Sequence, residues 1–225
     1  MILLAIDTAG VDCAVGLYDS DLDRMLAARS ETIGRGHAEK LMGMIDAVLD
    51  EASIALPSIE RLAVTIGPGS FTGIRVGLSA ARGLALALSV DIVGISTLGV
   101  LAAAERRRGG AVAVLAAMDA KRDEVYVQGF APDAAALGEA RVVPVDAFRD
   151  MAAEFARHGT GRVTGSACRL LENDAAGEGE AVADHFPMED IARLGAVAQA
   201  SGKPKPLYLR GPDVKPQAGF AVARA

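Results

Sequence analysis

The apolar positions of the first hundred residues fall into short runs and helical repeats. Short apolar runs between polar turns predict buried strands, and apolar positions repeating every three to four residues predict amphipathic helices. The expected strands are 2–6, 13–18, 25–33, 61–66 and 91–95. The expected helices are 36–52 and 72–88, followed by a third helix that is capped by Ser96 or Thr97 and ends near residue 107. Only short turns separate the first three strands, which favours an antiparallel meander.

A similar strand–turn–strand unit opens the second half of the chain. Strands are expected at 112–120, 123–130 and 141–145, an acidic loop at 175–181, and a last helix at 189–200 that stops before Gly202 and Pro204. We therefore divide the chain into an N-terminal lobe, 1–108, and a smaller C-terminal lobe, 109–225. Whether the last helix packs back on the first lobe stays open.

Three consecutive arginines mark the boundary between the lobes. Arg106, Arg107 and Arg108 precede a Gly-Gly pair, as cations commonly do at the C-terminal end of a helix. An RNA-facing patch is the alternative interpretation.

A glycine-rich stretch, GPGSFTG at 67–73, follows a predicted strand and precedes a predicted helix. Such a loop can hold phosphate on its backbone N–H groups and on the helix N-terminus. No lysine follows in P-loop register, and the glycine spacing differs from the dinucleotide fingerprint. Both nucleotide motifs fail, and the stretch is interpreted as a turn that starts the helix, with Thr72 as its cap.

Composition and charge narrow the function classes. The 225 residues are 51% hydrophobic and carry a net charge of −6, and only 4% are aromatic, with no tryptophan. This balance argues against non-specific nucleic-acid binding by the chain alone. Cys13 and Cys168 form neither a disulfide framework nor a zinc spacing. No signal peptide or membrane span is expected, and the predicted location is the cytoplasm.

Five motifs in order along the chain resemble the TsaB (YeaZ) family. They are IDT near the start, GPGSFTGIRVG before a helix, STL at 96–98, MDAKRDEVY at 118–126 and YLR at 208–210. The resemblance implies an α/β fold of the actin-like (ASKHA, ribonuclease H-like) class, with two related lobes whose mixed sheets are flanked by helices. It also implies the dimerisation subunit of the bacterial tRNA threonylcarbamoyltransferase complex, with the catalytic paralogue TsaD and the ATPase TsaE as partners, a possible homodimer when alone, and tRNA reached only through the complex.

The phosphate-loop positions are degenerate when compared with actin-like ATPases. These positions are Asp7, Thr8, Gly67, Gly69 and Thr72. The second hairpin, 118–124, has no glycine and carries three carboxylates, which would crowd and repel a triphosphate. We therefore expect no cofactor and no catalytic residue in this subunit. The alternative is a stand-alone enzyme, either an ATP-dependent transferase or a glycoprotease-like hydrolase.

A metal site is not expected. The catalytic relatives place two histidines one helical turn apart, whereas here Leu41 stands where the second would follow His37. His158 and His185 are isolated, and metal affinity needs several convergent ligands. His37 is interpreted as a helix-start or interface residue, with a catalytic role as the alternative.

Two helices carry more apolar surface than one sheet contact needs. On the helix at 72–88, Ile74, Leu78, Ala81, Ala85 and Leu88 form the sheet face, and on the helix at 36–52 the core face is Ala38, Met42, Ile45 and Leu49. The extra faces either pack on one another or meet a like pair of helices from a partner. The predicted partner surface is His37, Leu41, Met44, Val48, Val76, Ala80, Gly83 and Ala87.

Overall fold

The first lobe is built on a five-stranded mixed sheet. The computed structural model describes residues 1–157, 161–171 and 183–210. The strand order is β3-β2-β1-β4-β5, in which β1, β2 and β3 pair antiparallel and β4 and β5 add in parallel. Its elements are β1 (Ile2–Asp7), β2 (Asp12–Asp19), β3 (Arg24–Thr32), α1 (His37–Ala52), a 3-10 turn (Leu56–Ser58), β4 (Arg61–Gly67), α2 (Phe71–Leu88) and β5 (Asp91–Ser96).

The second lobe repeats this topology on a smaller scale. Its strand order is β8-β7-β6-β9, with β6, β7 and β8 antiparallel and β9 parallel to β6. The remaining elements are α3 (Thr97–Gly109), β6 (Ala113–Lys121), β7 (Glu124–Phe130), β8 (Arg141–Pro144), α4 (Val145–Arg157), β9 (Gly161–Thr164), a 3-10 helix (Ser166–Leu171) and α5 (Met188–Val197). Both sheets start as a three-stranded meander and add a parallel strand beside the first. The predicted α/β arrangement of two related lobes, with mixed sheets flanked by helices, is confirmed.

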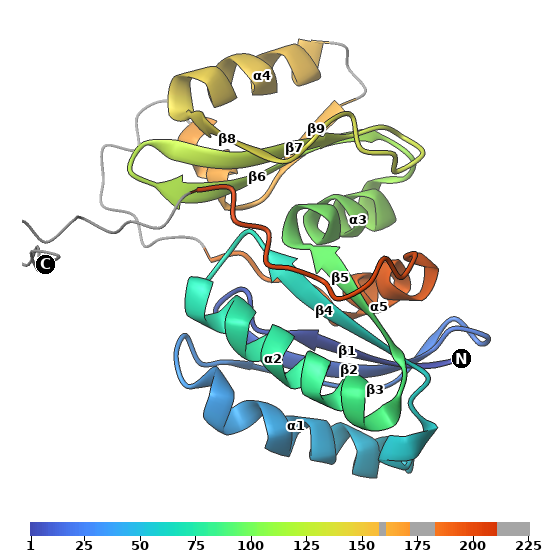
Figure 1. The fold of residues 1–225 in the computed structure, drawn as a ribbon. Helices are drawn as coiled ribbons and strands as arrows, with labels where there is room; N and C mark the ends of the chain where they lie inside the picture. Colours follow the sequence, from blue (N-terminus) through green and yellow to red (C-terminus); the bar gives the residue numbers. More distant parts are fainter. Residues whose placement is uncertain (158–160, 172–182, 211–225) are drawn as a thin grey trace, which may run out of the picture.

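The helices and sheets stack in layers (Figure 1). Helices α1 and α2 cover one face of the first sheet, α3 lies between the two sheets, and α4 covers the outer face of the second sheet. Helix α5 packs on β1, β2 and β4 of the first sheet, next to α3. A Cβ on Gly195 would lie 2.4 Å from Cβ of Ala63, so this glycine allows α5 to approach the sheet closely. The end of the chain therefore helps to complete the first lobe.

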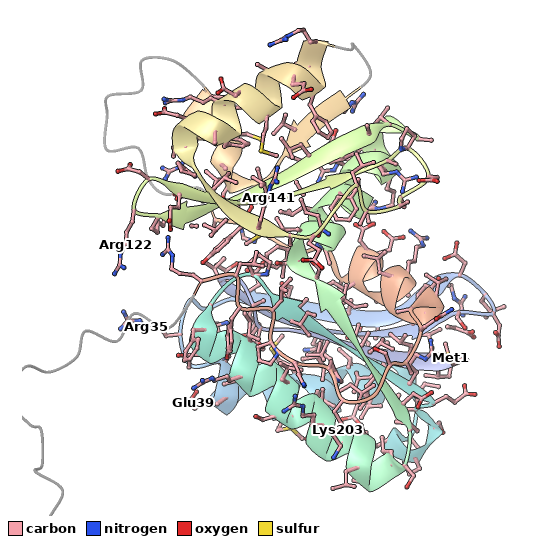
Figure 2. The ribbon with its side chains drawn as sticks, turned by 45° about the horizontal axis from the view of Figure 1, so that its top comes forward. Met1, Arg35, Glu39, Arg122, Arg141 and Lys203 are labelled. Atoms are coloured by element: carbon pink, nitrogen blue, oxygen red, sulfur yellow. The ribbon has the colours of Figure 1, made fainter. Side chains whose placement is uncertain are left out.

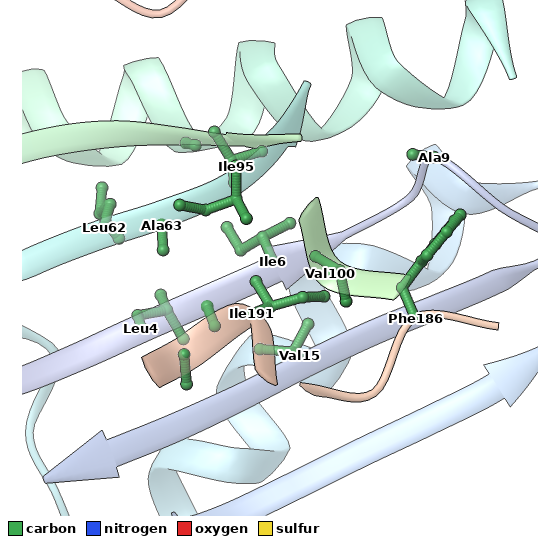
Figure 3. Close-up of a cluster of buried hydrophobic side chains, with 14 of the residues drawn as sticks. Leu4, Ile6, Ala9, Val15, Leu62, Ala63, Ile95, Val100, Phe186 and Ile191 are labelled. Atoms are coloured by element: carbon green, nitrogen blue, oxygen red, sulfur yellow. The ribbon is translucent and has the colours of Figure 1, made fainter. Parts of the chain in front are cut away.

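The core is divided by the second sheet into two parts. The larger part joins the first sheet to its helices and to the inner face of β6, and Figure 3 shows Val100 of α3 and Ile191 of α5 within it. The smaller part lies between the outer face of the second sheet and α4, with Phe148 fully buried at its centre. Successive side chains of β6 point to opposite faces of the second sheet. Val114 and Ala116 therefore belong to the larger part of the core, and Leu115 belongs to the smaller part.

Helix α4 and strand β9 were not predicted. Helix α4 carries Phe148, Met151, Ala152 and Phe155 at helical spacing against the second sheet, and β9 follows it as an edge strand. The expected acidic loop at 175–181 lies outside the described residues.

The predicted cap of α2 is wrong, whereas Ser96 caps α3 as expected. The helix begins one residue earlier than expected, and the Ser70 hydroxyl accepts a hydrogen bond from the Gly73 N–H (3.1 Å). Thr72 is thereby placed inside the first turn and is exposed. Ser96 accepts from the Gly99 N–H (3.5 Å).

The three arginines lie in the last turn of α3, where their charges complement the helix dipole. Arg107 forms two hydrogen bonds to Asp190 of α5, and Arg106 donates to the Pro132 carbonyl. Arg108 lies 3.7 Å from Glu105. The helix-end interpretation accounts for their positions.

Helix α2 alone is long and apolar enough, among the described residues, to pass a composition test for a membrane span. Its Ile74, Leu78 and Ala81 are buried against the first sheet. Core helices of folded domains pass the same test, so one such helix is weak evidence for a membrane span.

Candidate functional site

The turn after β1 and the glycine loop before α2 pack directly on each other. The Ser70 N–H donates to the Ala9 carbonyl (2.7 Å). The Thr8 hydroxyl donates to the Gly73 carbonyl (2.7 Å) and accepts from the Gly77 N–H (3.1 Å). Polar groups that a phosphate loop would direct at its ligand are thus used within the protein.

Two glycines of the loop are required by this contact. A Cβ on Gly73 would lie 1.9 Å from the Thr8 carbonyl oxygen, and a Cβ on Gly69 would lie 2.3 Å from the Ala9 carbonyl oxygen. Gly67 has a φ of 101°, which favours glycine. The degenerate phosphate-loop positions therefore hold the two turns together and fix the start of α2.

Asp7 is the most perturbed ionisable group of this region. It is fully buried, and its Oδ1 accepts from the Thr65 hydroxyl (2.6 Å) and from the Ala9 N–H (3.0 Å). Its Oδ2 has no hydrogen-bond partner among the described residues. Burial raises the pKa of Asp7 to about 6, because desolvation disfavours the charged form.

The hairpin between β6 and β7 differs from the expected repulsive turn. Lys121 Nζ lies 2.8 Å from Asp119 Oδ2, Arg169 bonds the same carboxylate, and Arg210 pairs with Glu124. Burial acts to raise the pKa of Asp119, but the hydrogen bonds from Lys121 and Arg169 outweigh it and the pKa is lowered. Two of the three predicted carboxylates are thus compensated by cations of the same chain, so the expected repulsion is reduced.

Crowding at this hairpin remains. Lys121, Arg122 and Asp123 all have positive φ, between 57° and 62°, where glycine would leave bare backbone. Three side chains therefore stand at the turn that would face a nucleotide.

A cleft of about 370 Å³ lies between the two lobes. It is lined by residues of both lobes, including Gly10, Ser70, Asp119, Ser166 and Asp184. Asp184 accepts hydrogen bonds from the N–H and the hydroxyl of Ser166, and burial raises the pKa of Asp184. Sequence reasoning missed Ser166 and Asp184, because no motif connects them and only the fold brings them together.

The faces of α1 differ from those predicted. The four α1 residues of the predicted partner surface are buried in this chain: His37, Leu41, Met44 and Val48. Met42, predicted for the core, is 48% exposed, and Ala38 is exposed as well. The apolar arc of α1 is wide, and contact with β2 and β3 decides which edge of it is covered.

The faces of α2 agree with the expectation. The predicted sheet-facing residues Ile74, Leu78, Ala81 and Ala85 are buried, and Leu88 is half-buried. Val76 and Ala80 are half-buried at the edge of the core, and Gly83 and Ala87 are exposed. The small residues of α2 thus form an outward face, and Ala38 and Met42 of α1 line the same groove as Val76 and Ala80.

A groove of about 460 Å³ runs between α1 and α2. Met42, Val76 and Ala80 line it, and Phe71 stands at one end with 48% of its surface exposed. Tyr208, which is 45% exposed, packs its ring 5.1 Å from that of Phe71.

Arg75 joins this aromatic pair. Its guanidinium carbon lies 3.8 Å from the centre of the Phe71 ring, and its Nε donates to the Tyr208 hydroxyl (3.0 Å). The aromatic pair and the arginine form a preassembled cluster beside the groove.

The histidines and cysteines are not gathered into one site. His37 begins α1 and its Nε2 has no partner among the described residues, while His185 Nδ1 lies 2.6 Å from Asp12 Oδ2. No group of three or more potential metal ligands occurs in the described ranges. Burial raises the pKa of Cys13 to about 11, and His158 lies outside the described residues.

Comparison with known proteins adds sequence and structural relatives. Residues 30–193 match the family model described as TsaD: tRNA N6-adenosine threonylcarbamoyltransferase. The tRNA threonylcarbamoyladenosine biosynthesis protein TsaB of Escherichia coli is 41% identical over 126 residues, which cover 56% of this chain and 53% of that protein. The matched region spans about half the length of the curated TsaB relatives.

Two solved structures from Pseudomonas aeruginosa share the fold over most of the chain. One, described as an uncharacterized protein with similarity to peptidase YEAZ, has a TM-score of 0.77 and 30% identity, covering 93% of this chain and 99% of its own. The second, YeaZ, has a TM-score of 0.72 and 31% identity, with coverages of 87% and 90%. Fold, motifs and matched relatives agree, and the chain belongs to the TsaB (YeaZ) family.

Proposed function

We propose that this chain acts in tRNA threonylcarbamoyladenosine biosynthesis as a non-catalytic subunit that binds and activates the catalytic paralogue TsaD. The observation that carries the proposal is the outward apolar surface of α1 and α2. Exposed large apolar side chains cluster there, namely Met42, Phe71 and Tyr208, around a groove lined by Val76 and Ala80. Contiguous exposed apolar surface beside aromatic and arginine side chains is typical of protein interfaces.

The geometry of the glycine loop supports a non-catalytic role. The N–H of Ser70 bonds the Ala9 carbonyl, and the backbone at Gly73 lies against Thr8. Opening this contact for a triphosphate would break the hydrogen bonds that position α2. The loop thus serves to hold the helix of the proposed interface in place.

The remaining parts of the proposal rest on the resemblance to the family. The ATPase TsaE joins the complex with TsaD. The chain contacts tRNA only as part of that complex, and it works in the cytoplasm. A homodimer through the α1–α2 surface forms when the partner is lacking. The net charge of −6 is consistent with a chain that does not bind tRNA by itself.

The test compares two adjacent alanines of α2. Ala80 lines the groove, whereas Ala81 is fully buried against the first sheet. Ala80→Arg leaves the long stem room to reach water in the free chain, but it buries an unpaired charge in the complex. We expect affinity for TsaD to fall by at least about a hundredfold, because a buried unpaired charge costs several kcal/mol.

Ala81→Arg is the matched control. It should lower the melting temperature, while Ala80→Arg should leave the melting temperature close to that of the wild type. The measurements are complex formation with purified TsaD by gel filtration and thermal unfolding of each variant. Normal association of Ala80→Arg, or unfolding as severe as that of Ala81→Arg, would overturn the interface assignment.

A further inference from the structure

A second hollow opens on the outer side of the second lobe, between its sheet and α4. Its volume is about 450 Å³, within the range of pockets that take small molecules. The hollow shares no lining residue with the inter-lobe cleft or with the α1–α2 groove. It therefore belongs to neither the degenerate nucleotide site nor the proposed partner surface.

The base of the hollow is apolar. Leu115 and Val127 lie on the strands and are fully buried, and Met151 and Phe155 of α4 form the opposite wall. Leu137 stands at the rim with 60% of its surface exposed. A ligand with a bulky apolar group would cover this exposed side chain and fill the space beside Phe155.

The rim carries charges of both signs. Arg141, at the start of β8, lines the hollow together with Glu139 and Glu154, and Figure 2 labels this arginine. None of the three forms an ion pair with any residue of the described ranges. The Arg141 guanidinium contacts the Met151 sulfur, at 3.7 Å.

Other arginines of the same lobe are paired. Arg149 bonds Asp146, Arg162 bonds Glu105, and Arg169 bonds Asp119. A guanidinium and two carboxylates that share one hollow without pairing each other leave both a cation and an anion available to a ligand. Charge-assisted hydrogen bonds of this kind are the strong ones in recognition.

We propose that this hollow binds a free α-amino acid with a large apolar side chain. The carboxylate of the ligand pairs with Arg141, its ammonium group pairs with Glu154, and its side chain packs against Leu137, Met151 and Phe155. A zwitterion matches both charges of the rim, whereas a simple acid or amine matches one. The inference is independent of the proposed partner function.

Titration calorimetry on the full chain tests this with three probes. L-phenylalanine presents both charged groups, 3-phenylpropionate lacks the ammonium group, and 2-phenylethylamine lacks the carboxylate. We expect saturable binding of L-phenylalanine and affinities at least about tenfold weaker for the other two, as expected for one lost charge-assisted hydrogen bond.

Two substitutions assign the charges. Arg141→Gln should weaken L-phenylalanine binding at least about tenfold while changing that of 2-phenylethylamine little. Glu154→Gln should weaken L-phenylalanine at least about tenfold while changing that of 3-phenylpropionate little. Both side chains are exposed, so the melting temperature should stay unchanged. Arg149→Gln is the control, because Arg149 lies on the same helix as Glu154 but does not line the hollow.

Three outcomes would overturn the proposal. They are no saturable binding of L-phenylalanine, equal binding of all three probes, and binding of L-phenylalanine that Arg141→Gln and Arg149→Gln reduce alike.

Discussion

Asp7 is a buried carboxyl group whose Oδ2 has no hydrogen-bond partner in the described part of the chain, and its raised pKa links stability to pH. Between the ordinary value of 3.8 and about 6, the folded chain binds a proton at Asp7 more readily than the unfolded chain does. The free energy of unfolding therefore falls as the pH rises through this window. Above about pH 6 the penalty of the buried charge is fully present.

Asp7→Asn should remove this pH dependence. The amide keeps an oxygen for Thr65 and for the Ala9 N–H but does not ionise. We expect the wild type to lose about 2 kcal/mol relative to the variant between pH 4 and pH 7, an order-of-magnitude figure from the change in pKa. Urea unfolding of both proteins across this range measures the difference.

Asp46→Asn serves as the control for this titration, because Asp46 is exposed on α1. The control should retain the pH dependence of the wild type. An Asp7→Asn variant that keeps the same slope would show that Asp7 is ionised at no cost in the folded chain.

Within α2, two glycines occupy positions with opposite requirements. A Cβ on Gly73 would overlap the Thr8 carbonyl oxygen, whereas a Cβ on Gly83 would meet nothing within 4 Å. Glycine inside a helix is less favourable than alanine by about 1 kcal/mol. At Gly73 the close contact with Thr8 requires glycine despite this cost. At Gly83 no packing contact among the described residues requires it.

Gly73→Ala and Gly83→Ala should therefore change stability in opposite directions. Gly73→Ala is expected to lower the free energy of unfolding by about 3 kcal/mol, because rigid backbone must move. Gly83→Ala is expected to raise it by up to about 1 kcal/mol. Chemical denaturation of both variants decides the point, and a stable Gly73→Ala would mean that the loop is free to move away from Thr8.

The sequence predicts the features of α2 that depend on local spacing, but not those that depend on contacts with distant segments. The sheet face of α2 was predicted because Ile74, Leu78 and Ala81 repeat with the helical period. The contact of Gly73 with Thr8 was not predictable, because it joins segments that are far apart in the chain. On α1 the apolar arc is so wide that the exposed edge, at Met42, depends on the position of β2 and β3. The apolar spacing around Phe148 is sufficient to indicate α4, although no helix was predicted there.

At the scale of the molecule, one ion pair fastens the end of the chain to the segment between the lobes. Arg107 at the end of α3 donates to both carboxylate oxygens of Asp190 on α5, at 3.0 and 2.9 Å. The Asp190 side chain is 4% exposed, whereas that of Arg107 is 41% exposed. If the ion pair is broken, water can therefore solvate the Arg107 guanidinium but reaches the Asp190 carboxylate poorly.

Removing the arginine should cost more than removing the aspartate. Arg107→Ala leaves a buried carboxylate without its cation, and we expect a loss of about 2–3 kcal/mol in the free energy of unfolding. Asp190→Ala leaves a guanidinium that water reaches, with a loss of about 1 kcal/mol. Thermal or urea unfolding compares them.

The exposed pair of Arg29 and Glu51 gives a reference for this comparison, and Arg29→Ala should cost no more than about 0.5 kcal/mol. Equal losses for Arg107→Ala and Asp190→Ala would contradict the assigned role of burial.

The return of α5 to the first sheet also has a consequence for the order in which the protein is made. The strands of that sheet end at Ser96, and α5 begins at Met188, about 90 residues later. At ordinary translation rates, this interval takes roughly 5–20 seconds. During that time the side of the nascent sheet that carries Ala63 lacks its helix, and this apolar surface is available to chaperones. The first lobe therefore reaches its final form only after the residues of α5 have been made.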